Sequence, residues 1–589
     1  MIARCYKPSL LIRSWQQKRF MSYGSSLAFA EFAYVQSGQA TLVAQQVDHI
    51  TRFTELSHKA PCRLIPIPKA GSKVGCIALG HYGGGMTAGD QVRVDLRVEE
   101  GAFVHLTTQG TNRVYKQKDD VNDDDISKHA HSEQSFNVVV ESGSTCVITP
   151  DPTQLQAGSM YRQRGKFDLK DSTSSLVLVD WISAGRLTAG ERWKHAHCRL
   201  RTEITVNGQV AVLDAQSLDT IRDVDWMGGL QLQAIGTIFL HNTSPEVIQR
   251  LQRLQRVLCR PYTAIRSAAE DSSSEEFDAS ILSGRTLLGV SQVGENSLYV
   301  ARFAASTNED IYRAINWSLE PLGISCYKER ITAHRSAPPI QVDDGKMPGM
   351  NDEVTTRSEL AGLSPRSTWA ALMLSDSNFP TGAFAHSAGL EAAHQLGLVK
   401  SPDTVARFLR AVVQSSINQS VPLIRLGYHG EPGSVAWSEL DAYAHALLAP
   451  NTPACEASID QGRNLLRVAK YLDENDSNGE RYDILQQHLD EDPSSRGHMA
   501  PLWGLIGRQT FALTEDEACT LFSFTVARDI VSAAVRLNLI GPLEGQRMLK
   551  QCVSSTQIPE PGEESMGSAP VLDAVHTNHT IMAMRLFRT

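Results

Sequence analysis

The sequence predicts a multidomain protein in which an all-β or β-rich N-terminal half, with two or so helices, is joined to an all-α C-terminal half. Its 589 residues are too many for one hydrophobic core, so two to four domains are expected. In the first half, apolar and polar residues alternate with the period of a half-buried strand, as at 92–98. In the second half, apolar residues recur at helical spacing, as at 405–412.

The domain boundaries follow from these changes of pattern. Residues 1–48 are predicted to be a disordered leader, 49–335 a β-rich domain, 336–366 a linker and 367–589 an all-α domain. The first thirty residues contain five Lys or Arg residues and no acid, the composition of an organellar transit peptide. The ten cysteines include no CxxC pair, which favours free thiols in a reducing compartment. We expect a cytoplasmic protein, with an organellar location as the alternative.

The composition argues against two kinds of partner. A net charge of −9 and a pI near 6.1 disfavour nucleic acid, because binding to the phosphate backbone requires clustered positive charge. No run approaches the roughly 18 apolar residues that a helix needs to cross a bilayer. We therefore expect no nucleic acid and no membrane among the partners.

The first elements of the β-rich half repeat. A strand at 92–98, a turn at Glu100-Gly101 and a second strand form one unit, and the same pattern of residues returns at 138–149. Two units of one design predict stacked β-layers rather than a parallel sheet flanked by helices.

The remaining elements of this half follow in order. Strands are expected at 176–181 and 198–213, and the second is broken by the hairpin signal Asn207-Gly208. Helices are expected at 245–259 and 310–322.

In the second half, Ser401-Pro402 supplies an N-cap and a first helical residue. Residues 518–540 are apolar nearly all round and predict a buried helix that ends at Gly541-Pro542. Three acidic, serine-rich segments are predicted to be loop insertions without chemistry: 118–135, 268–280 and 473–483.

The glycine cluster at 80–85 imitates nucleotide-binding motifs. It has the spacing of a P-loop, but Met86 stands where the phosphate-binding lysine is required. The spacing Gly83-x-Gly85-x-x-Ala88 imitates a dinucleotide fingerprint, but a strand follows it instead of a helix. The glycines are therefore interpreted as residues of tight turns.

Three carboxylates stand beside turn residues: Asp90, Asp151 and Glu191. Carboxylates placed in this way can pass a divalent cation along a polar path. The alternative is that each accepts hydrogen bonds from local backbone N–H groups, and the residues alone favour this alternative.

Of the short strings in the chain, His195-x-His197-Cys198 most resembles a metal-binding motif. If it is a strand, the two histidines share a face, and the His/Cys set suits nickel or zinc. Strings of this length are common and mostly bind nothing, so the site is a weak candidate.

The segment around Ser375, Asp376, His386 and Ser387 contains the residue types of a hydrolase triad. It lacks the GxSxG elbow, and sequence neighbours rarely form the triad in space. We interpret it as a fold-defining turn ahead of a helix.

Long motifs on both sides of residues 336–366 resemble known families. GGGMTAGDQVRVDLRVEEGAF and LTTQGTNRVYK, followed by ITPDPTQLQAGSMYRQR and VDWISAGRLTAGERW, closely resemble the urease accessory protein D family. LSDSNFPTGAFAHSAGLEAA, EASIDQGRNLLRVA, HMAPLWGLIG and the terminal RLFRT resemble urease accessory protein F. The matches keep the expected order over most of 50–335 and 368–589.

The resemblance implies a fusion of two urease maturation factors without catalytic turnover. It implies that the D-like half is a β-rich helical stack with a polar tunnel, that the F-like half is all-α, and that the halves contact each other. In these families, D binds apo-urease and F bridges D to a UreG-type GTPase, which delivers nickel when GTP is hydrolysed. Nickel in transit, no permanently bound cofactor and a possible homodimer through the F half are therefore expected.

Site residues are carried over by motif. Asp90, Asp151 and Glu191 become candidates for a nickel path, while His195, His197 and Cys198 remain weak metal candidates. Residues that would serve the F fold and its contacts are Pro380, Gly382, Phe384, His386, Ser387, Glu391, Arg463, Arg585 and Phe587. Two alternatives stay open: a metal-dependent hydrolase, and a pure protein–protein adaptor with no metal conduit.

Overall fold

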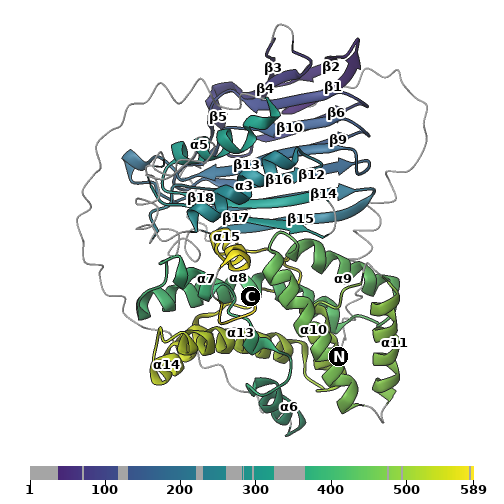
Figure 1. The fold of residues 1–589 in the computed structure, drawn as a ribbon, viewed down its shortest axis with the longest axis vertical. Helices are drawn as coiled ribbons and strands as arrows, with labels where there is room; N and C mark the ends of the chain where they lie inside the picture. The colour runs from purple at the N-terminus through teal and green to yellow at the C-terminus, as the bar shows by residue number, and fades with distance from the viewer. Residues whose placement is uncertain are drawn as a thin grey trace, which may run out of the picture.

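The computed structural model describes two packed halves, one of strands and one of helices (Figure 1). The family-implied fold class, a β-rich stack joined to an all-α domain, is confirmed. The residues described are 37–68, 72–116, 131–219, 230–259, 282, 284–294, 297–323, 365–473, 477–492, 495–582 and 585–589.

The β-rich half consists of two sheets. The first contains, in spatial order, β15 (Gln209–Asp219), β14 (His197–Val206), β12 (Met160–Leu169), β9 (Ser132–Val140), β6 (Gln91–Val98), β1 (Gln39–Val47) and β2 (Ile50–His58). The second contains β17 (Thr286–Val293), β18 (Leu298–Ala305), β16 (Ala234–His241), β13 (Ser175–Ser183), β10 (Thr145–Thr149), β7 (Phe103–Thr108), β4 (Gly75–His81) and β3 (Cys62–Pro66). Short strands β5 (Gly85–Met86), β8 (Asn112–Val114) and β11 (Thr153–Leu155) extend the second sheet.

The stacked layers are confirmed, and they are built from parallel strands. β6, β9 and β12 pair in parallel in the first sheet, and β7, β10 and β13 do so in the second. Each unit sends one strand to each sheet, so the chain returns to a sheet in the same direction without a crossover helix. The register aligns Val98 with Val140 and Val140 with Leu169, so β12–β13 is a third unit that the sequence pattern did not reveal.

The core of this half lies between the two sheets. Val92, Val94, Leu96 and Val98 are all buried, as their alternation predicts. Helices α3 (Pro245–Leu258) and α5 (Asn308–Leu319) lie near their predicted places. They pack on the other side of the second sheet and enclose a separate apolar cluster (Figure 1).

The helical half is formed by ten α-helices among the described residues. They are α6 (Pro365–Ser375), α7 (Leu390–Gln395), α8 (Pro402–Tyr428), α9 (Val435–Leu448), α10 (Thr452–Leu472), α11 (Ser477–Glu491), α12 (Met499–Gln509), α13 (Glu515–Arg536), α14 (Pro542–Ser555) and α15 (Pro570–Thr577). Ser401 caps α8 as predicted. The close packing of α8 on α12 depends on glycine, because a Cβ at Gly504 would lie 2.0 Å from the Ile424 carbonyl oxygen.

Several predicted boundaries are wrong. The leader does not extend to residue 48, because Gln39–Val47 forms β1 between β2 and β6. Within the expected loop insertions, 132–135 belongs to β9 and 477–483 belongs to α11, while 268–280 lies outside the described residues. The linker at 336–366 lies outside them as well, apart from the first two residues of α6.

Helix α13 differs from its prediction in two ways. It ends at Arg536, and Gly541-Pro542 begins the next helix rather than ending this one. By length and composition α13 is also long and apolar enough to cross a membrane, contrary to the sequence expectation. Of its most apolar 18 residues, 56% are buried, as for a core helix.

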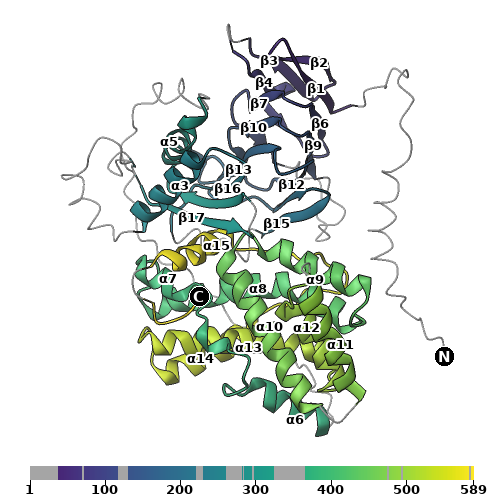
Figure 2. The ribbon, with the colours of Figure 1, turned by 45° about the vertical axis from the view of Figure 1, so that its right-hand side comes forward.

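The two halves pack against each other, with α15 on β17 and β18 and α9 on β15 (Figure 2). Apolar side chains of both halves belong to one continuous cluster, with Leu218 on one side and Val575 on the other. The approach of α15 to β17 depends on Gly289, where a Cβ would lie 2.4 Å from the Ala574 carbonyl oxygen. The boundary between the halves is therefore a packed interface.

Candidate functional site

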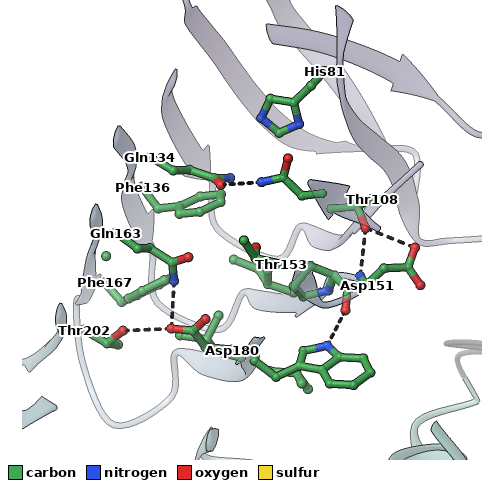
Figure 3. A pocket seen from close by; sticks show the side chains of 17 residues that line it. His81, Thr108, Gln134, Phe136, Asp151, Thr153, Gln163, Phe167, Asp180 and Thr202 are labelled. Carbon is green, nitrogen blue, oxygen red and sulfur yellow. Dashed lines mark hydrogen bonds between the residues drawn. The ribbon is translucent and has the colours of Figure 1, made fainter. Parts of the chain in front are cut away.

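A cavity of about 40 Å³ lies in the β-rich half, lined by strands of both sheets (Figure 3). The polar lining includes Thr108 from β7, Gln163 from β12 and Asp180 from β13, together with Asp151 just after β10. A water molecule needs roughly 10–15 Å³ of such volume, so the cavity has room for about three. It is a compartment inside the core in which several polar side chains stand among apolar ones.

Asp151 is held rigidly at this cavity. It is 2% exposed, and its carboxylate accepts hydrogen bonds from the hydroxyl of Thr108 at 3.2 Å and from that of Tyr312 on α5 at 2.9 Å. Its own N–H donates to the Thr108 hydroxyl at 2.8 Å. A buried carboxylate with fixed donors retains a defined direction for its remaining lone pairs.

Asp180 lies on the other side of the same cavity (Figure 3). Gln163 donates to its carboxylate at 2.8 Å and Thr202 at 3.5 Å. Burial raises the pKa of Asp180 to about 6, and the nearby Asp214 adds to the rise. Because this pKa is close to neutrality, the arrival of a cation would readily remove the proton.

His81 adds a nitrogen ligand to the lining. Burial lowers its pKa to about 4 in spite of the opposing charge of Asp90, so the imidazole is neutral at neutral pH. Its Nε2 is buried and has no hydrogen-bond partner among the described residues. A neutral imidazole with a vacant nitrogen is a ligand for borderline divalent cations.

The three predicted carboxylates lie in different environments from one another in the structure. Asp151 lines the cavity, and Asp90 is linked to it through its charge on His81. Asp90 also accepts hydrogen bonds from the N–H and hydroxyl of Thr87, at 2.7 and 3.0 Å. Glu191 does not line the cavity, and its carboxylate is paired with Arg186, which lowers its pKa.

The His195-x-His197-Cys198 string does not form a joint metal site among the described residues. β14 begins at His197, so His195 lies before the strand and the predicted shared strand face is wrong. His195 Nε2 lies 3.0 Å from the Leu218 carbonyl oxygen, while the His197 ring packs on His131 with centroids 5.4 Å apart. The ligand atoms of these three residues do not lie close enough to one another to share one metal ion.

The fold-motif residues of the helical half join the segment before α7 to the C-terminal tail. Gly382 has a φ of +80° and allows the turn. The Ser387 N–H donates to the Thr589 carbonyl at 2.7 Å, and the His386 ring contacts the Thr589 hydroxyl. Glu391, 3% exposed, accepts from the N–H of Leu586 at 2.6 Å. The two motifs are therefore one structural unit.

The other fold-motif residues surround this unit. Phe587 is buried beneath the Arg536 guanidinium, which lies 4.4 Å from the ring centroid. Arg463 donates to the Arg496 carbonyl at 2.9 Å. The residues of this set that face solvent are Pro380, Phe384, Arg463 and Arg585.

Sequence reasoning missed His81, Asp180 and Tyr312. His81 lies within the glycine cluster at 80–85, and Asp180 is the acid within the apolar run of β13, which is a detectable signal for a buried functional carboxylate. Tyr312 gave no signal, because its partner Asp151 is distant in the sequence.

Comparison with protein-family models gives two matches in one chain. Residues 36–322 match the model described as UreD urease accessory protein, and residues 399–553 match the model described as UreF.

Curated relatives agree with both matches. Urease accessory protein F of Oryza sativa subsp. indica is 34% identical over 236 residues, which are 39% of this chain and 88% of the relative. Urease accessory protein D of Arabidopsis thaliana is 26% identical over 299 residues, which are 48% of this chain and 95% of the relative. Urease accessory protein UreD of Sorangium cellulosum is 32% identical over 183 residues, 31% of this chain and 54% of the relative.

Proposed function

The chain belongs to the urease accessory protein families D and F, one domain of each, and on this basis we propose that it is a scaffold for nickel insertion into urease. Membership of these families supports a role in urease maturation. In the proposed arrangement, the D-type half binds apo-urease and the F-type half holds a UreG-type GTPase. Nickel is cargo, and GTP belongs to the partner.

The observation that carries this proposal is the packed interface between the halves. Gly567 donates its N–H to the Ala215 carbonyl at 2.8 Å and accepts from the Ser217 N–H at 2.8 Å, so a helical-half segment is bonded to β15. A scaffold of this kind holds two docking surfaces at a fixed separation. On one chain the two modules meet at an effective concentration near about 1 mM.

The cavity supports a route for the cargo. Its carboxylates and imidazole, from Asp151, Asp180 and His81, are oxygen and nitrogen ligands suited to a borderline cation. These groups do not form a three-ligand cluster, so an ion would be passed between ligands rather than stored. Weak, successive contacts are what a conduit requires.

Reconstitution tests the proposal. Apo-urease, the GTPase, nickel, GTP and bicarbonate are combined with and without this chain, and urease activity is measured. We expect activation to depend on the chain. Unchanged activity on adding it would refute the scaffold role.

Two variants separate the alternatives. If the cavity is the conduit, Asp151→Asn lowers nickel-dependent activation while binding to apo-urease persists. Full activation by this variant would favour the pure adaptor. Hydrolytic activity of the isolated chain that disappears with Asp151→Ala would favour a metal-dependent hydrolase.

A further inference from the structure

Three possible metal ligands from distant parts of the sequence meet in the helical half. They are His445 on α9, Cys455 on α10 and His498, the residue before α12. Their ligand atoms all lie within 4.8 Å of one another. Within the part of the chain that the structure describes, this is the one such group of three.

The distances match those of coordinated ligands. His445 Nδ1 lies 3.2 Å from His498 Nε2 and 3.6 Å from Cys455 Sγ. Around a tetrahedral ion with bonds of about 2.05 Å to nitrogen and about 2.3 Å to sulfur, the corresponding edges are about 3.3 and about 3.6 Å. The side chains therefore need little movement to share one ion.

Each of the two helices supplies a ligand and a group that orients His498. On α9, Asp441 stands one turn before His445 and accepts hydrogen bonds from the N–H groups of Gly497 at 2.9 Å and His498 at 2.8 Å. On α10, Ser458 stands one turn after Cys455, and its hydroxyl lies 3.1 Å from His498 Nδ1. Fixing the second ring nitrogen in this way aims Nε2 at the other ligands.

The cluster is sheltered but reachable. His498 is fully buried, Cys455 is 6% exposed and His445 is half-buried. A cavity of about 200 Å³ borders His498 and Ser458, which leaves room for a water molecule beside the cluster.

We propose that His445, Cys455 and His498 form a binding site for a borderline divalent cation, Zn²⁺ or Ni²⁺, with one coordination position open. A thiolate with two imidazoles selects these ions over Mg²⁺ and Ca²⁺, which prefer oxygen ligands. Binding exchanges the thiol proton of Cys455 for the metal and releases it to solvent. Three protein ligands rather than four are typical of sites that exchange a ligand. This site goes beyond the proposed function, which places the route for the cargo in the cavity of the β-rich half.

The competing interpretation is a hydrogen-bonded cluster that binds no ion. His498 Nε2 or the Cys455 thiol can donate to His445 Nδ1 at the same distances. The two interpretations differ in what happens when metal is added, because only a metal site uses the thiolate.

The test uses the full chain after chelator treatment and dialysis. Zn²⁺, Ni²⁺ and, as a hard-cation control, Mg²⁺ are titrated against a chromophoric chelator, and Co²⁺ is added as a spectroscopic probe. We expect one tight equivalent of Zn²⁺ or Ni²⁺, no Mg²⁺ binding, and a thiolate-to-cobalt charge-transfer band. Cys455→Ser should weaken binding at least about tenfold and abolish the band, and Ser458→Ala should weaken it about tenfold.

The matched control is Cys552→Ser, another buried thiol of the helical half. It should bind metal and give the cobalt band as the unaltered chain does. Equal binding and an equal band with Cys455→Ser would overturn the site, as would the lack of a tight equivalent in the unaltered chain. Urease activation is measured separately, so failure of the scaffold role and failure of this site are distinguishable.

Discussion

Arg302 and Asp573 lie on opposite sides of the boundary between the two halves, with their charged groups 3.7 Å apart. Arg302 also pairs with Asp214 of its own half at 3.0 Å and is 4% exposed. Burial alone would lower its pKa, but Asp214 and Asp573 raise it. The guanidinium therefore links a sheet residue to a helix residue inside the interface.

Replacing Arg302 should destabilise the whole chain. Arg302→Met leaves two carboxylates near each other without their cation, and breaking a buried pair in this way costs about 3–5 kcal/mol. Urea unfolding measures the loss. The exposed ion pair of Arg547 provides the control, since Arg547→Ala should cost under about 1 kcal/mol. Equal urea-unfolding midpoints for Arg302→Met and Arg547→Ala would show that Arg302 is not essential to the interface.

Cutting the chain between residues 336 and 366 should leave the halves associated, because the interface is packed and hydrogen-bonded. After site-specific cleavage, gel filtration shows whether the two halves elute together in one peak or separately in two. In the cut protein, Gly289→Val should release the halves, because its side chain would enter the space of the Ala574 carbonyl. Gly541→Ala, where a Cβ meets nothing within 4 Å, is the control. Separation of the unaltered halves would contradict the described interface.

Asp180 should make stability depend on pH. Its pKa of about 6 lies above the unfolded value, so the folded state holds its proton more strongly. The free energy of unfolding therefore falls as pH rises from about 4 to about 6, by about 3 kcal/mol at most. Asp180→Asn removes this loss, so it should stabilise the chain near about pH 7.5 and have little effect near about pH 4.

The measurement for Asp180 is a set of urea midpoints across this pH range. Asp168, an exposed carboxylate on β12, serves as the control through Asp168→Asn. A pH-independent difference between the Asp180 variant and the unaltered chain would exclude the raised pKa.

Glu391 should hold the C-terminal tail in place. It accepts from the N–H groups of Leu586 and Phe587 and lies 3.0 Å from His579 Nε2. Glu391→Ala leaves these donors unpaired, at about 1–3 kcal/mol each. Hydrogen exchange of the tail amides should accelerate, while Glu431→Ala, at an exposed position, leaves it unchanged. Unaltered exchange with Glu391→Ala would show that other contacts hold the tail.

Local patterns in the sequence were sufficient for much of the fold. Alternation at 92–98 and the Asn207-Gly208 turn predicted β6 and the β14–β15 hairpin, because both signals depend on neighbouring residues alone. The parallel pairing was not predictable, since it depends on contacts between strands far apart in sequence. The segment at 39–47 was missed because only two neighbouring strands make it part of the sheet.

The residues of the candidate sites were likewise predictable only where the signal is local in the sequence. Asp151 was found because a turn motif marked it, whereas its partner Tyr312 comes from a helix more than a hundred residues away. The two histidines and the cysteine of the helical half lie in three separate segments, and no spacing rule joins them. Short strings such as His195-x-His197 attract attention in a sequence, but the fold decides which histidines meet.

The position of β15 at the end of the first sheet has a consequence for solubility. An outermost strand offers unpaired backbone groups that can recruit strands from other molecules and start aggregation. Here Gly567 hydrogen-bonds to β15 and α9 packs against it, so the helical half covers that edge strand. A β-rich half produced alone would expose β15. Because both halves are on one chain, every copy of the β-rich half is synthesised together with the helical half that covers this strand.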